Sequence, residues 1–462
     1  MTPSRIATRQ RFSSRLQPSV SSYTDVLGVR MYWKKHYYRV GSHSDGRDDL
    51  PTEPNELDVF ISASRKRIEP WLSAVFQAEH LNLMLGSGFT TAIGYMAGAG
   101  VAGVAKVRFG TAFDAAIDAH AEAGAKAMNR GPANIEDQFR SALAVLEGLT
   151  VIEAPKAAKL KIALDTQLSV FLALLLKTES GIATGKDGRS REKAEAALQS
   201  FLLSFASRAA SRERLHVFTS NYDRLIEHGC DLAGLRVIDR FVGALNPVFR
   251  SSRVEVDLHY NPPGIRGEPR FLEGVVRFTK LHGSLDWHFS KEARQIHRKG
   301  IPFGAPGDHT DVPRQPIDTV MVYPNPAKDV ETTQYPYAEL FRDFAASVCR
   351  PNAVVVTYGY GFGDDHINRV LLDMLTIPST HLVIIAYEAD PRVTAFCEKT
   401  RDAQVSLLVG PHFADLATLV DNYLPKPALD YITGRMTELL KHRPTDTIPD
   451  DTPTAPGDGD PI

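Results

Sequence analysis

The sequence predicts an α/β fold, with a mostly parallel sheet flanked by helices and a large helical module. Two observations support this prediction. One short apolar run at 81–85 and four later short runs rich in β-branched residues each end at a glycine or at a polar cluster, which is typical of buried parallel strands. Between the first and second runs, residues 102–212 are dominated by Ala, Leu, Glu and Lys with helical spacing.

The expected elements follow a simple order along the chain. A strand at 81–85 leads through a glycine loop into an alanine-rich helix. The helical module at 102–212 is broken by Gly131-Pro132 and by a polar loop near 181–189. Further strands are expected at 215–219, 275–280, 353–358 and 381–387. Because ligands bind outside the carboxyl ends of parallel strands, the residues that follow these strands are the first site candidates.

The composition is that of an ordinary globular protein with two or three domains, or one large domain with insertions. The 462 residues carry 53 Lys plus Arg and 55 Asp plus Glu, and 43% are hydrophobic. The longest apolar run near the middle, 168–176, is about half of the ~20 residues that cross a bilayer, so we expect a buried helix there. The N-terminus lacks the apolar stretch of a secretory signal. A cytoplasmic protein without membrane association is therefore expected.

Cysteine and carboxylate spacing predicts no metal site. Cys230, Cys349 and Cys397 are too few and too dispersed for a disulfide framework or a zinc ribbon. We interpret each as a small buried hydrophobic residue rather than a reactive thiol. Asp364 and Asp365 lie side by side, but no further carboxylates stand at metal-ligand spacing, so helix capping is the preferred interpretation.

Charge is concentrated at the two ends of the chain. Residues 1–40 carry eight Lys or Arg and one Asp, interleaved with Tyr and Trp, whereas 443–462 carry one Arg, five Asp and five Pro. For the basic segment we place a protein partner or self-assembly first and nucleic acid second. The predicted organisation is a basic interaction segment at 1–70, a central α/β domain at 71–425, a C-terminal helix at 426–442 and a disordered tail at 443–462.

Two candidate loops follow the first two expected strands. Gly86-Ser87-Gly88-Phe89-Thr90 would let the backbone approach a phosphate, with unpaired N–H groups of the next helix close by. This loop lacks the full spacing of a dinucleotide fingerprint, and a plain strand-to-helix turn explains it equally well. In Thr219-Ser220-Asn221-Tyr222-Asp223, Asn221 can fix a sugar hydroxyl and a water, while Asp223 can hold the loop. A simple helix cap is the alternative.

Two more clusters follow later strands. In the first, Lys280-Leu281-His282-Gly283-Ser284-Leu285-Asp286-Trp287, His282 can act as a general base near neutral pH. A lone histidine is more often structural. The second is Tyr358-Gly359-Tyr360-Gly361-Phe362-Gly363-Asp364-Asp365-His366. Its alternating glycines predict another close-approach loop, with the two aspartates capping a helix that begins near His366.

The amino-acid sequences of these clusters and their order along the chain resemble those of the bacterial sirtuin-like family. Its members are Rossmann-type domains that are related to NAD-dependent deacylases and are found in antiphage defence proteins. The resemblance covers roughly 81–424, with the helical module as the family's variable insertion. Asn134-Ile135-Glu136 is similar to a short acidic block in that insertion. Ser87 and Thr90 stand where the family commonly has Ala and Ser. The matching blocks are the glycine loop at 86–90, T-x-N-Y-D at 219–223, K-L-H-G-S-x-x-W at 280–287 and G-Y-G-F-G-D-D at 359–365.

The resemblance implies a Rossmann-like sheet that binds NAD as substrate, with Asn221 and His282 as the catalytic pair. Asn221 would orient the ribose and a water, and His282 would act as base toward a ribose hydroxyl or the water. Glu388 follows the last expected strand, where such sheets often place a carboxylate on an adenosine ribose hydroxyl. The residues expected to bind NAD are Gly86, Ser87, Gly88, Phe89, Thr90, Tyr222, Asp223, Gly283, Ser284, Gly359, Tyr360, Gly361, Phe362, Asp364 and Glu388.

Two activities occur in this superfamily, which are transfer of ADP-ribose to an acyl-lysine and simple hydrolysis. True deacylases carry a four-cysteine zinc ribbon, which three dispersed cysteines cannot build, so no zinc is expected. We therefore favour hydrolysis of NAD to nicotinamide and ADP-ribose, which would deplete cellular NAD during infection. An NAD- or ADP-ribose-binding sensor or scaffold without turnover is the alternative, and a deacylase ranks after it. Family members pair with HerA-type helicase-ATPases or Argonaute-like proteins, or assemble with themselves, so a HerA-type partner or a homo-oligomer is expected.

Overall fold

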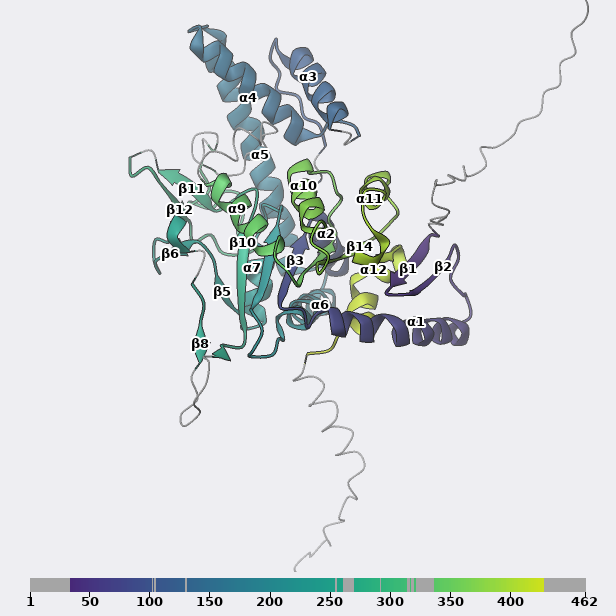
Figure 1. Ribbon diagram of the computed structural model, residues 1–462. Coiled ribbons are helices and arrows are strands. Elements are labelled where there is room, and N and C mark those ends of the chain that lie inside the picture. Colours follow the sequence, from purple (N-terminus) through teal and green to yellow (C-terminus); the bar gives the residue numbers. More distant parts are fainter. Residues whose placement is uncertain are drawn as a thin grey trace, which may run out of the picture.

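A large, mostly parallel sheet forms the centre of the molecule. The computed structural model describes residues 34–427, except for 102, 104, 129–130, 254–255, 261–269, 291, 314–315, 317–319 and 321–335. Within the described residues, nine strands pair in the order β2-β1-β15-β14-β13-β3-β4-β10-β5, and helices flank the sheet (Figure 1). The predicted α/β class is therefore confirmed. Residues 1–33 of the basic segment, most of the expected helix at 426–442 and the tail at 443–462 lie outside the described residues.

The five predicted strands all form, and they pair in parallel with one another. Their apolar, β-branched residues are buried on both faces, as a parallel sheet covered by helices requires. They are β3 (His80–Leu85), β4 (Leu215–Thr219), β10 (Val275–Lys280), β13 (Ala353–Tyr358) and β14 (His381–Ala386). Two parallel strands were not predicted, which are β5 (Arg236–Ile238) and β15 (Val405–Val409).

The described part of the basic segment is built into this sheet. β1 (His36–Val40) pairs antiparallel with β15 at the sheet edge, and β2 (His43–Arg47) pairs antiparallel with β1. Helix α1 (Pro54–Val75) follows, and its buried Phe60, Ile68 and Leu72 join the same core as the sheet residue Leu83. Residues 36–75 are thus part of the α/β fold and are not separated from it at residue 70.

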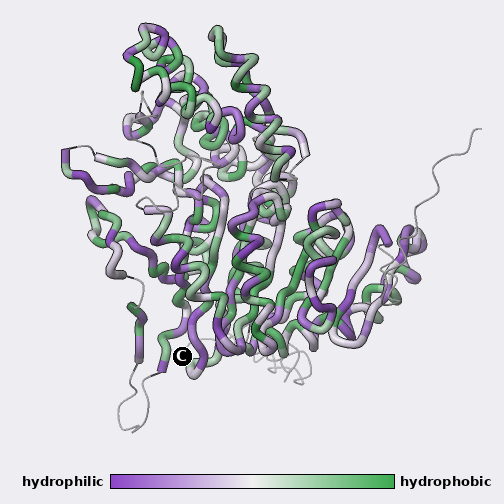
Figure 2. The backbone as a smooth tube through the Cα atoms, turned by 45° about the horizontal axis from the view of Figure 1, so that its top comes forward, coloured by the Kyte–Doolittle hydropathy of each residue, from purple (hydrophilic) through white to green (hydrophobic). Residues whose placement is uncertain are grey.

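Two layers of helices sandwich the sheet, each over its own apolar core. One face packs against α1 and three helices, which are α2 (Ser87–Ala97), α6 (Gly188–Ala206) and α7 (Leu225–Leu232). The other face packs against α9 (Tyr337–Val348), α10 (Asp365–Met374) and α11 (Pro391–Cys397). The alternation of β3 shows this division, because Leu83 faces the first core and Met84 the second. Figure 2 shows the apolar strands running through the centre.

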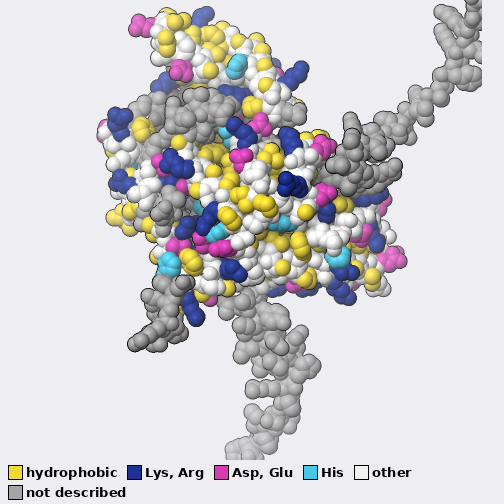
Figure 3. Space-filling view, in the orientation of Figure 1, with side chains coloured by type: hydrophobic (Ala, Val, Ile, Leu, Met, Phe, Trp, Pro, Cys, Tyr) yellow, Lys and Arg dark blue, Asp and Glu magenta, His cyan; other side chains and the backbone are white. Residues whose placement is uncertain are grey.

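Helices fill the segment that was predicted to be helical. They are α3 (Asp114–Ala127), α4 (Ile135–Val151), α5 (Lys156–Thr184) and α6. Figure 1 shows α3, α4 and the start of α5 projecting from one end of the sheet. The apolar run at 168–176 lies in α5, where Leu168, Leu172 and Leu176 are buried. Hydrophobic side chains also reach the surface of the projecting part (Figure 3), among them Val151 and Ile162.

Smaller elements complete the fold. None of the described helices combines the length and apolar character that a membrane span needs. After β15 the chain forms α12 (Pro411–Ala414), α13 (Leu416–Thr418) and a π-helical turn (Leu419–Tyr423), while 3-10 turns form at Ser251–Arg253 and Asp402–Gln404. A small four-stranded antiparallel sheet contains β6 (Phe241–Val242), β7 (Val248–Phe249), β11 (Trp287–Ser290) and β12 (Gln295–Arg298). A second antiparallel sheet pairs β8 (His259–Tyr260) with β9 (Arg270–Phe271).

Candidate functional site

The four predicted loops come together because the strands before them end in one row. The sheet register aligns Lys280 with Thr219, Thr219 with Leu85, and Leu85 with Tyr358. The residue after each of these strands therefore leaves the sheet at the same carboxyl edge. Elements that are far apart in sequence thus place their polar loops beside one another.

A cavity of about 510 Å³ lies at this carboxyl edge, between the strand ends and helices α4 and α5. This volume falls in the range of about 300–1,000 Å³ that is usual for ligand pockets. The cavity wall includes most of the predicted polar site residues. The predicted residues that line it are Gly86, Ser87, Thr90, Asn221, Tyr222, Asp223, His282, Tyr360, Gly361 and Asp364.

Asn221 is held rigidly at the cavity wall. Its Nδ2 donates to the carbonyl of Gly86 at 3.0 Å and to Oγ1 of Thr90 at 3.1 Å. Thr90 in turn donates to Oδ2 of Asp223 at 2.8 Å, so the glycine loop and the loop after β4 share one network. Among the described residues, no donor reaches Oδ1 of Asn221. The carboxamide is therefore oriented with an oxygen that can accept a hydrogen bond from a ligand hydroxyl or a water.

His282 and Asp364 form a hydrogen-bonded dyad. Nε2 of His282 lies 2.8 Å from Oδ2 of Asp364, and both residues are buried although they line the cavity. Asp364 also caps α10 through its other oxygen, which accepts from the amide of His366 at 3.0 Å. An ionised Asp364 requires the proton on Nε2, which makes Nδ1 the lone-pair nitrogen of the neutral imidazole. This tautomer can accept a proton.

The helical module contributes to the cavity through α4. Oη of Tyr222 donates to Oε1 of Glu136 at 3.2 Å, so the acidic block at 134–136 reaches the loop that carries Asn221. Burial, together with the charge of Glu136, raises the pKa of Tyr222 well above its ordinary value, so the phenol remains a donor. Asn134 starts α4 in a capping box with Asp137, which fixes the orientation of Glu136.

The glycines of two loops permit a close backbone contact. A Cβ on Gly86 would lie 2.4 Å from the carbonyl oxygen of Gly359, and one on Gly88 would lie 2.7 Å from the Cα of Gly359. Gly359 has a φ of 62° and accepts a hydrogen bond from the Gly88 amide at 3.0 Å. These positions therefore need glycine for packing between the loops. The amides of Gly88 and Phe89 already have backbone acceptors, which leaves neither of them for a phosphate.

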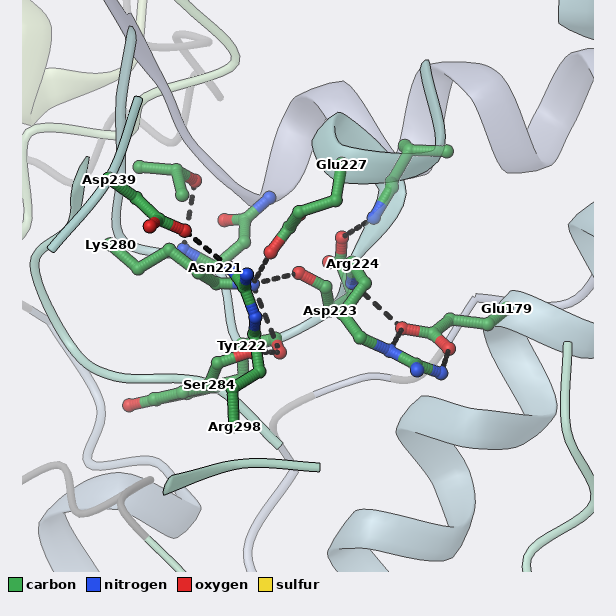
Figure 4. A network of polar contacts seen from close by, with 12 residues as sticks. Glu179, Asn221, Tyr222, Asp223, Arg224, Glu227, Asp239, Lys280, Ser284 and Arg298 are labelled. Atoms are coloured by element: carbon green, nitrogen blue, oxygen red, sulfur yellow. Dashed lines mark hydrogen bonds and ion pairs between the residues drawn. The ribbon is translucent and has the colours of Figure 1, made fainter. Parts of the chain in front are cut away.

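Buried charges support the loop after β4 from behind. Figure 4 shows Asn221, Tyr222 and Asp223 between Lys280 on one side and the Arg224–Glu179 pair on the other. The Lys280 ammonium group donates to the carbonyl of Asp223 and pairs with Oε1 of Glu227 at 3.0 Å. Burial raises the pKa of Glu227 to about 7 despite this partner, because its Oε2 is buried without a hydrogen bond.

Several predicted binding residues do not line the cavity. Phe89 is fully buried in the core, Ser284 is buried and donates to the Tyr222 carbonyl, and Phe362 packs on Phe396. Glu388 is exposed, because the chain has left the sheet before it reaches this residue. The predicted residues outside the cavity wall are Gly88, Phe89, Gly283, Ser284, Gly359, Phe362 and Glu388.

Arg392 is a cavity residue that the sequence did not predict. It lies in the first turn of α11, after Asp390-Pro391, which was predicted to start a helix. Asp390 accepts two hydrogen bonds from it, from Nε and Nη2, both at 2.9 Å. Its Nη1 lies 3.2 Å from where a Cβ on Gly363 would stand. Asn134, Glu136, Ser220 and Gly363 belong to the sequence blocks singled out above but were not among the expected binding residues. The remaining lining residues are Thr91, Val101, Gly103, Pro132, Asp137, Phe171, Leu175 and Thr178.

Two of the three cysteines are buried as predicted, whereas Cys349 is only partly buried. Cys230 and Cys397 are buried, and burial raises the pKa of each thiol to about 12. Among the described residues, no group of His, Cys, Asp and Glu side chains could hold a metal ion. No family model matches this chain, and no curated protein matches its sequence. The chemistry of the cavity therefore has to be inferred from its own side chains.

Proposed function

We propose that this chain is an NAD glycohydrolase with a Rossmann-like sheet, which cleaves NAD to nicotinamide and ADP-ribose. The observation that carries the proposal is the meeting of Asn221 with the His282–Asp364 dyad in one cavity at the carboxyl edge of the sheet. The resemblance of the four loops to sirtuin-like proteins supports the same assignment. The cavity geometry and the sequence resemblance both support Asn221 and His282 as the catalytic pair.

The cavity suits a ligand that carries both hydroxyl and phosphate groups. The helices α2 and α10 begin at its wall, where their N-termini favour negative charge. Arg392 adds a guanidinium group, which pairs well with phosphate oxygens. Oδ1 of Asn221 and the carboxylate of Glu136 also line the cavity and can accept hydrogen bonds from ribose hydroxyls.

The proposed reaction is the displacement of nicotinamide by water. The bond between ribose C1′ and the pyridinium nitrogen breaks, and its electron pair neutralises the departing ring. The oxygen of a water bonds to C1′, and the water proton passes to Nδ1 of His282 and then to solvent. Asn221 would hold the ribose and the water in line, while the carboxylate of Asp364 stabilises the imidazolium.

We extend the proposal to a role in antiphage defence, in which loss of NAD stops the infected cell. The resemblance implies a partner of the HerA-type helicase-ATPase class or assembly of several copies of this chain. Exposed apolar residues such as Val151 and Ile162 on the projecting helices would be available to such an interface. NAD turnover should therefore be measured on the chain alone and in the presence of the partner ATPase.

The test measures release of nicotinamide from NAD by the full chain and by Asn221→Ala and His282→Ala variants. Both variants should keep their circular dichroism and lose turnover, whereas His43→Ala, an exposed histidine in β2, should be as active as the wild type. Full turnover by His282→Ala would refute the mechanism. Tight NAD binding by calorimetry without any product would indicate a sensor, and release that requires an acylated peptide would indicate a deacylase.

A further inference from the structure

Four carboxylates line the proposed NAD cavity, and in three of them both oxygens already have partners in the protein. Asp364 pairs with His282 through one oxygen and caps the N-terminus of α10 through the other. Asp223 accepts from Oγ1 of Thr90 at 2.8 Å and from the amide of Leu225 at 3.1 Å, with one bond to each oxygen. The four acids are Glu136, Asp137, Asp223 and Asp364.

The two acids at the start of α4 differ in their contacts. Oδ2 of Asp137 accepts from the Asn134 amide at 3.1 Å, and its Oδ1 pairs with Arg140 at 2.9 Å. Oε1 of Glu136 accepts from Oη of Tyr222, whereas no donor among the described residues reaches its Oε2 and no described cation pairs with it. The side chain is only partly buried at the cavity wall. Glu136 is therefore the carboxylate that retains an oxygen for a ligand.

Tyr222 connects Glu136 with the catalytic pair. It directly follows Asn221 in the chain, and the centroid of its ring lies 6.3 Å from that of the His282 ring. The phenol ring is buried, and Phe171 of α5 contacts it edge-on with a centroid distance of 5.9 Å. A ring that is fixed in this way holds the carboxylate of Glu136 in a defined place near the residues that would orient the ribose and the water.

A carboxylate without a cationic partner matches the charge that develops in the proposed reaction. Bound NAD carries its positive charge on the pyridinium ring, and nicotinamide departs as a neutral molecule, so the leaving group needs no acid. As the bond to C1′ breaks, the positive charge moves onto C1′ and the ring oxygen of the ribose, which gives an oxocarbenium-like transition state. A negative charge beside this sugar stabilises the transition state more than it stabilises bound NAD.

We infer that Glu136 is a third catalytic residue, whose Oε2 accepts a hydrogen bond from a hydroxyl of the nicotinamide ribose and whose charge stabilises the cationic sugar. Tyr222 is a positioning residue, because it acts on the reaction by holding Glu136. The inference rests on the proposed hydrolysis of NAD. It also gives the helical module a part in catalysis, since α4 supplies the carboxylate and α5 packs against the tyrosine that holds it.

The test measures kcat for nicotinamide release by the full chain and by Glu136→Gln, which keeps the size of the side chain and an acceptor for Tyr222 but removes the charge. We expect kcat to fall about 100-fold, because the charge acts on the transition state. NAD affinity should change by less than about three-fold, as measured by calorimetry in a His282→Ala background, where NAD is not consumed. Glu147→Gln alters an exposed acid of α4 outside the cavity wall and should have the wild-type kcat.

Tyr222→Phe tests the positioning role. It removes Oη and leaves the ring to pack against Phe171, so kcat should fall about ten-fold through the loss of one hydrogen bond to a charged group. In a Glu136→Gln background the same change should cause no further loss, because Tyr222 acts through the charge of Glu136. Losses that multiply in the double variant would show that Tyr222 has a separate, structural role.

Two results would overturn the inference and leave NAD hydrolysis in place. One is a wild-type kcat in Glu136→Gln, and the other is a loss of activity in Glu136→Gln that comes entirely from weaker NAD binding. The absence of nicotinamide release by the wild type, alone and with the proposed ATPase partner, would instead refute the proposed function and the inference with it. If Glu136→Gln fails to fold, Tyr222→Phe decides, and an unchanged kcat in that variant would overturn the inference.

Discussion

The two edges of the central sheet use the same strands for different kinds of polar site. At the carboxyl edge, the strands end at glycines, Asn221 and the segment that carries His282, and two helices begin there. At the amino edge, the polar groups are side chains on the strands themselves, such as His216 and Arg277. One edge offers loops and helix N-termini, and the other offers a wall of side chains under α9.

The two edges differ in whether their buried polar side chains face a cavity or pair with one another. At the carboxyl edge, Asn221 and His282 are oriented by neighbouring protein groups and still face a cavity, as a reacting site requires. At the amino edge, Glu213 and Asp343 are paired with arginines. The first arrangement suits catalysis, and the second is a set of polar side chains that largely satisfy one another.

The largest expected effect that separates the edges comes from Asp364→Asn. Asparagine still caps α10, but it no longer favours the proton on Nε2 of His282 or stabilises the imidazolium. We expect turnover of NAD to fall about 100-fold or more, as in other dyads that lose the carboxylate, with the fold unchanged. The kcat for nicotinamide release tests this, and Asp365→Asn, an exposed neighbour, is the control. Equal loss in both variants would contradict the assigned role.

Gly359→Ala should destabilise the carboxyl edge. The added Cβ would meet the Phe89 amide nitrogen at 2.5 Å, at a φ of 62°. We expect a loss of about 1–3 kcal/mol in the free energy of unfolding from this overpacking. Gly234→Ala has a similar φ of 65° with open space around it, so it isolates the conformational cost. Urea denaturation should show the larger loss for Gly359→Ala, and equal losses would mean that the loop contact is unimportant.

Glu227 and Glu213 should give opposite pH dependences at the two edges. Glu227 has a pKa of about 7, so the folded state holds a proton that the unfolded chain releases near its ordinary pKa. Stability should decline as pH rises from about 4.5 to about 7, and Glu227→Gln should remove that decline of about 1–3 kcal/mol. Burial acts to raise the pKa of Glu213, but hydrogen bonds from Arg350 and His80 outweigh it and lower the value.

Glu213 therefore stabilises the fold above its ordinary carboxyl pKa, and this stabilisation is lost as pH falls through the lowered value. Glu213→Gln should remove the acid-side loss and leave the decline near neutral pH in place. Urea unfolding at about pH 3, about pH 5 and about pH 8 measures both slopes, the acid-side one between the first two values and the Glu227 one between the last two. Identical slopes in the Glu227→Gln and wild-type proteins would contradict the assignment of the buried proton.

The smallest expected effect is that of Arg392→Met at the carboxyl edge. If Arg392 contacts a phosphate of NAD, its loss should raise KM for NAD about ten-fold and leave kcat nearly unchanged. The reason is that the arginine is remote from the bond that breaks. Steady-state kinetics measure both values, with Arg342→Met as the surface control. A fall in kcat with an unchanged KM would show that Arg392 has another role.

The sequence predicted the carboxyl edge better than the amino edge for a physical reason. Strands such as 353–358 are uninterrupted apolar runs, and the polar residues after them stand out, so Asn221 and His282 were found. The amino-edge residues Asn82, His216 and Arg277 are interspersed among apolar strand residues, where they have the pattern of ordinary strand alternation. The register of the sheet is what brings them together.

Other features depend on contacts that sequence spacing does not encode. The His282–Asp364 pair joins residues from two different loops, and Arg392 reaches the cavity only because α11 starts beside Gly363. Glu388 was placed by analogy with the position after a strand, yet it is exposed. Strand β1 was not predicted, because the basic and aromatic composition of its segment indicated a separate interaction element.

The most direct test of the central claim is the product balance of NAD incubated with the wild-type protein, alone and with the proposed ATPase partner, and with His282→Ala. Chromatography measures NAD, nicotinamide and ADP-ribose in the same sample. We expect the wild type to release nicotinamide and ADP-ribose in equal amounts as NAD disappears, and His282→Ala to leave NAD intact. Undiminished NAD with the wild type, or equal release by His282→Ala, would contradict the account.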